Sequence, residues 1–172
     1  ASLSRPGGLV FCSPDAHIAN DEWGATEFQS GGMKLMTVDA VAGKIGPMAL
    51  EAAMARAPEG GRFGTPLALS LTNATECGTV YAPDEVADLA GRAHALGLSV
   101  HLDGARFANA VAASGATPAA LTWRAGVDLM SFGGTKNGCW AAEAIIVFSP
   151  EKVHDLAARR QRAGQTFSKA RF

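Results

Sequence analysis

The feature that most constrains this chain is a pair of short apolar runs, each ending in a polar turn that contains glycine. Residues 98–102 lead into Asp103-Gly104-Ala105-Arg106, and residues 127–132 lead into Gly133-Gly134-Thr135-Lys136. The two turns lie about 30 residues apart, the length that a strand, a crossover helix and the next parallel strand require. Since ligands gather beyond the carboxyl ends of parallel strands, Asp103 and Lys136 are predicted to share one edge of a sheet.

The rest of the chain alternates strand-like and helix-like segments, which is typical of a parallel sheet covered on both faces. Apolar runs predict strands at residues 8–12, 33–38, 67–72, 99–102, 128–132 and 144–148. Helices are predicted at residues 48–57 with Pro58 closing, 85–96 capped by Asp84 and ended by Gly97, 107–113, 118–124, and in a basic segment starting at 149–151. The expected fold class is α/β, with three layers (α/β/α) around a mostly parallel sheet.

Asp103, Arg106 and Lys136 together have the chemistry of a pyridoxal phosphate site. A lysine amine can hold the cofactor aldehyde as an imine, and the cofactor then acts as an electron sink for a carbanion at an amino-acid α-carbon. Asp103 would keep the pyridine nitrogen protonated, and Arg106 could bond the phenolic oxygen or a nearby anion. Each residue also has a structural interpretation: a solvated lysine, an aspartate that caps a helix, and an arginine in a surface ion pair.

Four segments resemble the low-specificity L-threonine aldolases, in the beta-eliminating lyase group of fold-type I pyridoxal phosphate enzymes. They follow in order along the chain: residues 16–22 (AHIANDE), 101–106 (HLDGAR), 131–138 (SFGGTKNG) and 167–172 (FSKARF). The resemblance implies the large domain of the aspartate aminotransferase-like fold. It also implies retro-aldol cleavage of L-threonine and L-allo-threonine to glycine and acetaldehyde, with pyridoxal 5'-phosphate as cofactor.

The resemblance further implies a role for each residue of the site. It places the imine on Lys136, the pyridinium partner on Asp103, a cofactor contact on Arg106, and a ring stacked over the pyridine on His17. A histidine satisfied within the core is the structural alternative for His17. Glu76 occupies the place where some relatives carry a histidine near the substrate hydroxyl, and a histidine, an ordered water or a phosphate oxygen could take the hydroxyl proton.

The resemblance also predicts that residues 1–172 are a partial large domain of a longer polypeptide. A Gly-Thr phosphate loop is expected before His17, and a smaller carboxy-terminal domain is expected to supply a carboxylate-binding arginine; neither is recognisable. The chain alone is therefore expected to be inactive, and the intact enzyme to be a homodimer or homotetramer.

Composition argues against several other classes of protein. A net charge of −1 gives no reason to expect nucleic acid or a membrane surface as partner, and no apolar run approaches the ~20 residues of a bilayer span. Cys12, Cys77 and Cys139 are odd in number and lack metal or redox spacing, which favours reduced thiols in the cytoplasm. His101 and Asp103 face the same way on one strand, but no third ligand accompanies them, so no metal is expected. The expected partner is a small amino-acid substrate.

Two alternatives to threonine cleavage remain open. A serine hydroxymethyltransferase-like enzyme, a beta-eliminating lyase acting on tyrosine, or an aminotransferase would use the same Lys136 and Asp103. The chain could also be a catalytically inert folded fragment.

Overall fold

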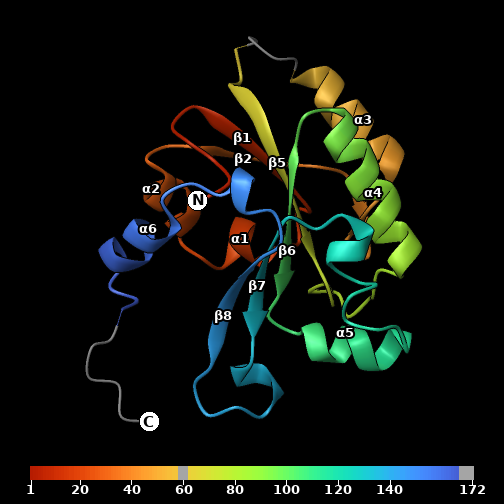
Figure 1. Ribbon diagram of the computed structural model, residues 1–172. Helices are drawn as coiled ribbons and strands as arrows, with labels where there is room; N and C mark the ends of the chain where they lie inside the picture. The colour runs from red at the N-terminus through yellow and green to blue at the C-terminus, as the bar shows by residue number, and fades with distance from the viewer. Residues whose placement is uncertain (58–61, 167–172) are drawn as a thin grey trace.

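The computed structural model describes residues 1–57 and 62–166, which form a six-stranded sheet with helices on both sides (Figure 1). Its strands are β1 (Gly8–Cys12), β2 (Lys34–Thr37), β5 (Thr65–Thr72), β6 (Ser99–Gly104), β7 (Leu129–Gly133) and β8 (Glu143–Val147). Their order is β2-β1-β5-β6-β7-β8, and all neighbours are parallel except β7 and β8. The predicted α/β class, the mostly parallel sheet and its predicted strands are confirmed.

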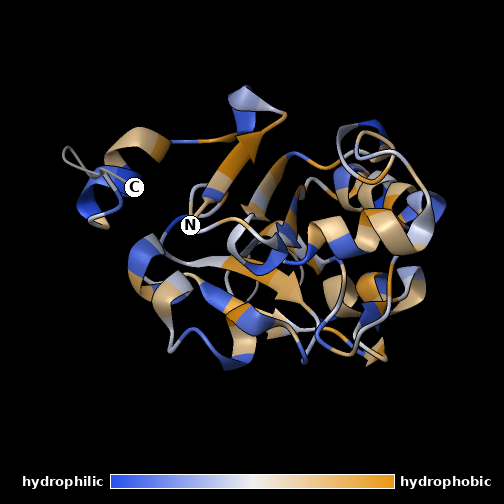
Figure 2. Ribbon diagram, turned by 90° about the horizontal axis from the view of Figure 1, so that it is seen from below, coloured by the Kyte–Doolittle hydropathy of each residue, from blue (hydrophilic) through white to orange (hydrophobic). Residues whose placement is uncertain are grey.

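In the described part of the chain, six helices accompany the sheet: α1 (His17–Asn20), α2 (Ala25–Ser30), α3 (Pro47–Arg56), α4 (Pro83–Ala95), α5 (Phe107–Ser114) and α6 (Leu156–Arg162). Figure 1 shows α3 and α4 on one side of the sheet, with α2 and α6 on the other. The strands are mostly hydrophobic, whereas the helices mix hydrophobic and hydrophilic residues (Figure 2). No helix in the described residues is both long and apolar enough to cross a bilayer.

Helix α4 illustrates how the amphipathic pattern builds the core. Its buried residues recur every three or four positions and pack on the sheet: Val86, Leu89, Ala90 and Ala93. Gly97, with φ of +76°, ends the helix as predicted. The prediction that Asp84 caps α4 is wrong. The N-cap is Ala82, which offers no side-chain acceptor, and its backbone N–H donates to Glu85 Oε2 at 2.7 Å.

Two other helix predictions are also corrected by the structure. Residues 118–124 form turns and a 3-10 turn, Trp123–Ala125, because Thr122 Oγ1 donates to the Pro118 carbonyl (2.7 Å) and competes with helical bonding. The basic helix begins at Leu156, since Pro150–Lys152 forms only a 3-10 turn. Pro58, the predicted end of α3, lies outside the described residues, as does the segment 167–172.

Some short elements were not predicted from the sequence. They are α1, α2 and an antiparallel hairpin of β3 (Ala40–Val41) and β4 (Lys44–Ile45). None of them is long enough for hydrophobic periodicity to be recognised. Ala42 and Gly43 connect the hairpin with φ of 48° and 80°, the left-handed pair that tight hairpin turns use.

Strand β6 separates the core from the functional face of the sheet. Val100 and Leu102 are buried in the hydrophobic cluster beneath α3 and α4. Because side chains alternate along a strand, His101 and Asp103 point to the opposite face. This alternation places polar side chains on one face without exposing the core.

Asp128 joins three elements at the edge where β6 and β7 begin. Its side chain is 3% exposed, and its oxygens accept bonds from Lys152 Nζ (2.8 Å), Ser149 Oγ (2.7 Å), the Val100 N–H (2.8 Å) and His94 Nε2 (2.9 Å). Burial alone would raise the pKa of Asp128, but these hydrogen bonds, led by that of Lys152, outweigh burial and hold the pKa below its ordinary value.

Asp128→Asn should therefore lower the free energy of unfolding by about 3 kcal/mol, because it removes the buried charge that these donors surround. Asp88→Asn is the matched control, since Asp88 forms an exposed pair with Arg92. Its substitution should lower the free energy of unfolding by less than about 1 kcal/mol.

A carboxylate with a lowered folded-state pKa stabilises the fold at neutral pH and loses that effect as pH falls through the folded pKa. Urea unfolding at pH 7 and in acid should show the penalty of Asp128→Asn shrinking in acid. Equal penalties for Asp128→Asn and Asp88→Asn at pH 7 would contradict this account.

Candidate functional site

The predicted site residues lie at one edge of the sheet. The strands β1, β5, β6 and β7 are parallel neighbours, so their carboxyl ends meet there, and in Figure 1 the arrowheads of β6 and β7 point to this edge beside α5. His17 follows β1, Asp103 and Arg106 come at the end of β6, and Lys136 follows β7. The prediction that Asp103 and Lys136 share one edge is confirmed.

Close backbone contact joins the lysine turn to the aspartate turn. A Cβ on Gly133 would lie 2.7 Å from the Cα and carbonyl oxygen of Ala105, so only glycine fits there. Asn137 Nδ2 donates to the Gly133 carbonyl at 2.6 Å and reaches the Ala105 carbonyl at 3.5 Å. These contacts fix the turn that carries Lys136 against the turn that follows Asp103.

Lys136 lies in the 3-10 turn Thr135–Asn137 and is exposed. Within residues 1–57 and 62–166, its amine forms no ion pair, whereas Lys44 and Lys152 are paired with Glu85 and Asp128. The Lys136 amine is therefore available to a ligand at the edge.

Asp103 is half-buried, and its Oδ1 accepts a hydrogen bond from the Ala105 N–H at 3.0 Å. This bond caps the turn after β6 and not the helix α5, whose N-cap is Arg106. Oδ2 has no protein hydrogen-bond partner in the described part of the chain and can accept a proton donor from a ligand.

His101, two residues before Asp103, is held between hydroxyl groups of the neighbouring strands. Its Nδ1 lies 2.9 Å from Ser70 Oγ on β5, and its Nε2 lies 2.9 Å from Ser131 Oγ on β7. Burial lowers the pKa of His101 to about 4, so the ring is neutral at pH 7. Among the described residues, no group of three His, Cys, Asp or Glu side chains could hold a metal ion.

Arg106 points toward the loop that follows β5. Its Nη1 donates to Glu76 Oε1 at 3.0 Å, and both side chains are partly buried. The two residues line a cavity of about 580 Å³ together with Thr75, Gly78, Val80 and Asn109, among others. The sequence placed Glu76 near the site but did not indicate its ion pair with Arg106.

His17 begins α1, and its side chain is 38% exposed, which argues against a histidine satisfied within the core. Nδ1 lies 3.0 Å from Glu22 Oε1. The hydrogen bond with Glu22 raises the pKa of His17, and the charges of Glu22, Asp21 and Glu76 raise it further. The His17 ring is therefore oriented by Glu22 and remains partly exposed.

Comparison with known proteins shows the family of the chain. The model of the beta-eliminating lyase family matches residues 1–172, and the chain belongs to that family. The chain is 44% identical over 173 aligned positions to the low-specificity L-threonine aldolases of a Pseudomonas species and of Pseudomonas aeruginosa. Each alignment covers 100% of the chain and 49% of the relative, so the chain spans about half the length of these curated relatives.

Solved structures share the fold of this chain. A threonine aldolase of Leishmania major superposes with a TM-score of 0.82 at 27% identity, covering 95% of this chain and 47% of that chain. A cystathionine gamma synthase of Xanthomonas oryzae superposes with a TM-score of 0.62 at 18% identity, covering 97% of this chain and 38% of that one. The second likeness supports the fold alone.

Proposed function

We propose that the protein cleaves L-threonine and L-allo-threonine to glycine and acetaldehyde with pyridoxal 5'-phosphate. The observation that carries this proposal is the meeting of Asp103 and Lys136 at neighbouring strand ends, in a chain 44% identical to threonine aldolases. The threonine aldolase activity itself is inferred from the names of those relatives.

The side chains at the edge fit the cofactor. Lys136 offers an amine without an ion-pair partner in the described residues, and Asp103 offers a carboxylate oxygen. The neutral His101 places no competing positive charge beside Asp103. When bound, pyridoxal phosphate supplies an electron sink for the carbanion at the substrate α-carbon.

Each residue of this chain then has a distinct task. Lys136 Nζ would hold the cofactor by bonding its aldehyde carbon. Asp103 would keep a proton on the pyridine nitrogen, Arg106 would donate to an anionic oxygen of the cofactor, and His17 would lie flat against the pyridine ring.

Threonine cleavage can be separated from the related activities by one assay. The natural polypeptide that contains this sequence should release glycine and acetaldehyde from threonine without folate or a keto acid. A dependence on folate would favour a serine hydroxymethyltransferase-like activity, and a dependence on a keto acid would favour an aminotransferase. No product under any of these conditions would contradict the proposal.

The role of His17 predicts different effects for two substitutions. His17→Phe should keep most of the cofactor affinity, whereas His17→Ala should weaken it about fivefold to tenfold, because only phenylalanine preserves a stacked ring. Cofactor titration followed by absorbance measures both, with the exposed His154→Ala as control. Equal affinity in all of these proteins would show that His17 does not stack.

We further propose that residues 1–172 are the cofactor-binding part of a longer cytoplasmic polypeptide that assembles as a homodimer or homotetramer. Coverage of about half of each relative supports the longer polypeptide. The odd number of cysteines, without metal or redox spacing, supports a reducing compartment.

The exposed hydrophobic side chains of Trp23, Trp140 and Ile145 support association between copies of the polypeptide. Light scattering of the natural polypeptide would test the oligomer.

A further inference from the structure

The ion pair between Arg106 and Glu76 connects two neighbouring strand ends. Arg106 follows β6 and Glu76 follows β5, and their contact of 3.0 Å spans 30 residues of sequence. The contact uses one terminal nitrogen of the guanidinium group. Because the planar fork presents five N–H donors, the remaining donors stay available to an anionic oxygen.

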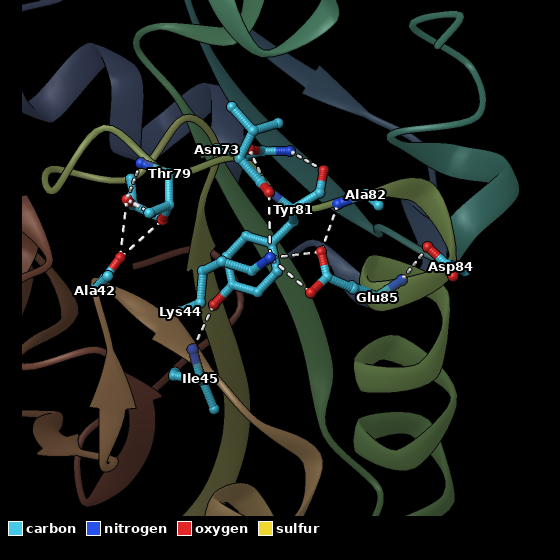
Figure 3. Close-up of polar contacts among 11 residues, drawn as sticks. Ala42, Lys44, Ile45, Asn73, Thr79, Tyr81, Ala82, Asp84 and Glu85 are labelled. Carbon is cyan, nitrogen blue, oxygen red and sulfur yellow. Dashed lines mark hydrogen bonds and ion pairs between the residues drawn. The ribbon is translucent and has the colours of Figure 1, made fainter. Parts of the chain in front are cut away.

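The loop that carries Glu76 is itself fixed at both ends. Asn73 Oδ1 accepts from the Tyr81 N–H at 3.1 Å, and Asn73 Nδ2 donates to the Tyr81 carbonyl at 3.2 Å, so one side chain closes the loop (Figure 3). Next to Glu76, Thr75 Oγ1 lies 2.8 Å from Thr79 Oγ1. Glu76 therefore lies in a loop with little freedom to move away from Arg106.

The β3–β4 hairpin supports this loop from outside. Thr79 Oγ1 donates to the Ala42 carbonyl at 2.7 Å, and the Ile45 N–H donates to the Tyr81 hydroxyl at 2.6 Å (Figure 3). Lys44 Nζ donates to the Val80 carbonyl at 3.2 Å. At the hairpin turn, a Cβ on Gly43 would lie 2.8 Å from Thr75 Cβ, so hairpin and loop are in direct contact.

We propose that Glu76 is a positioning residue, which holds the Arg106 guanidinium toward the cofactor and offsets its charge, with the β3–β4 hairpin as its support. This inference rests on the proposed function. A flexible arginine would have to be ordered each time the cofactor binds, whereas one held by a fixed carboxylate is already oriented. The charge of Glu76 also acts on His17, where it helps to raise the pKa. Glu76 thus acts on two residues of the candidate site, Arg106 and His17.

The test is a double-mutant cycle on cofactor affinity in the natural polypeptide. Glu76→Ala should weaken pyridoxal phosphate binding about tenfold, and Glu76→Gln less, because an amide oxygen can still accept a weaker hydrogen bond from Arg106. In an Arg106→Ala background, Glu76→Ala should change the affinity by less than about twofold, since its partner is already gone. Glu51→Gln is the matched control, because Glu51 pairs with Arg92 on the surface.

A second measurement detects the charge of Glu76 independently of turnover. Removing a nearby negative charge lowers the pKa of a histidine, so Glu76→Gln should lower the pKa of His17 in an NMR titration and Glu51→Gln should not. Thermal unfolding of each variant shows whether it folds. If Glu76→Ala does not fold, the isosteric Glu76→Gln is used in its place.

The outcomes separate this inference from the proposed function. If the wild type binds the cofactor and cleaves threonine, but Glu76→Ala weakens binding equally with and without Arg106, then Glu76 supports only the loop and the inference is wrong. Unchanged affinity in both Glu76 variants would also overturn it. A wild type that binds no cofactor would overturn the proposed function, and this inference with it.

Discussion

Lys136→Ala should reduce threonine cleavage by at least about a thousandfold, because the residue that bonds the cofactor aldehyde would be absent. The substitution removes an exposed side chain with no ion pair in the described residues, so the fold should be unaffected. The turn itself is held by Asn137 and by the contact of Gly133 with Ala105, neither of which involves the lysine side chain.

Lys34→Ala is the control for this variant, since Lys34 is exposed on β2 at the far side of the sheet. Its glycine and acetaldehyde production should equal that of the wild type. Substantial threonine cleavage by Lys136→Ala, with normal unfolding, would contradict the assignment of Lys136.

Asp103→Asn should lower kcat by about a hundredfold to a thousandfold while cofactor binding is weakened much less. A neutral amide cannot hold the pyridine nitrogen in its protonated form, and each 1.36 kcal/mol of lost carbanion stabilisation costs about tenfold in rate. The asparagine side-chain oxygen can still accept the hydrogen bond from the Ala105 N–H, so the turn after β6 should persist.

The absorbance spectrum of bound cofactor and the rate of acetaldehyde release measure the two effects of Asp103→Asn separately. Asp88→Asn, on the surface of α4, provides the control with unchanged turnover. If Asp103→Asn turns over threonine at the wild-type rate, Asp103 is not the partner of the pyridine nitrogen.

Local sequence predicted the elements that have a clear hydrophobic pattern. Strands β6 and β7 are short apolar runs that end in polar turns, and α4 has buried residues at helical spacing with glycine at its end. Because parallel strands bring their carboxyl ends to one edge, the meeting of Asp103 and Lys136 followed from topology alone.

The errors arose where side-chain hydrogen bonds, which hydrophobic spacing does not reveal, decide the structure. Residues 118–124 have helical composition, yet Thr122 bonds the local backbone and the segment forms turns. Ser149 and Lys152, in the segment where the basic helix was expected to start, instead bond Asp128, and α6 begins at Leu156. The ion pair of Glu76 with Arg106 likewise depends on how two loops meet, which spacing along the chain does not reveal.

The central claim, that Lys136 bonds the cofactor, is tested most directly by reducing the protein with borohydride in the presence of pyridoxal phosphate and mapping the modified peptide. Reduction converts the bond between the lysine and the aldehyde carbon into a stable secondary amine. The account predicts a single adduct on Lys136, which disappears in Lys136→Ala. An adduct on Lys34, Lys44, Lys152 or Lys169, with Lys136 unmodified, would contradict it.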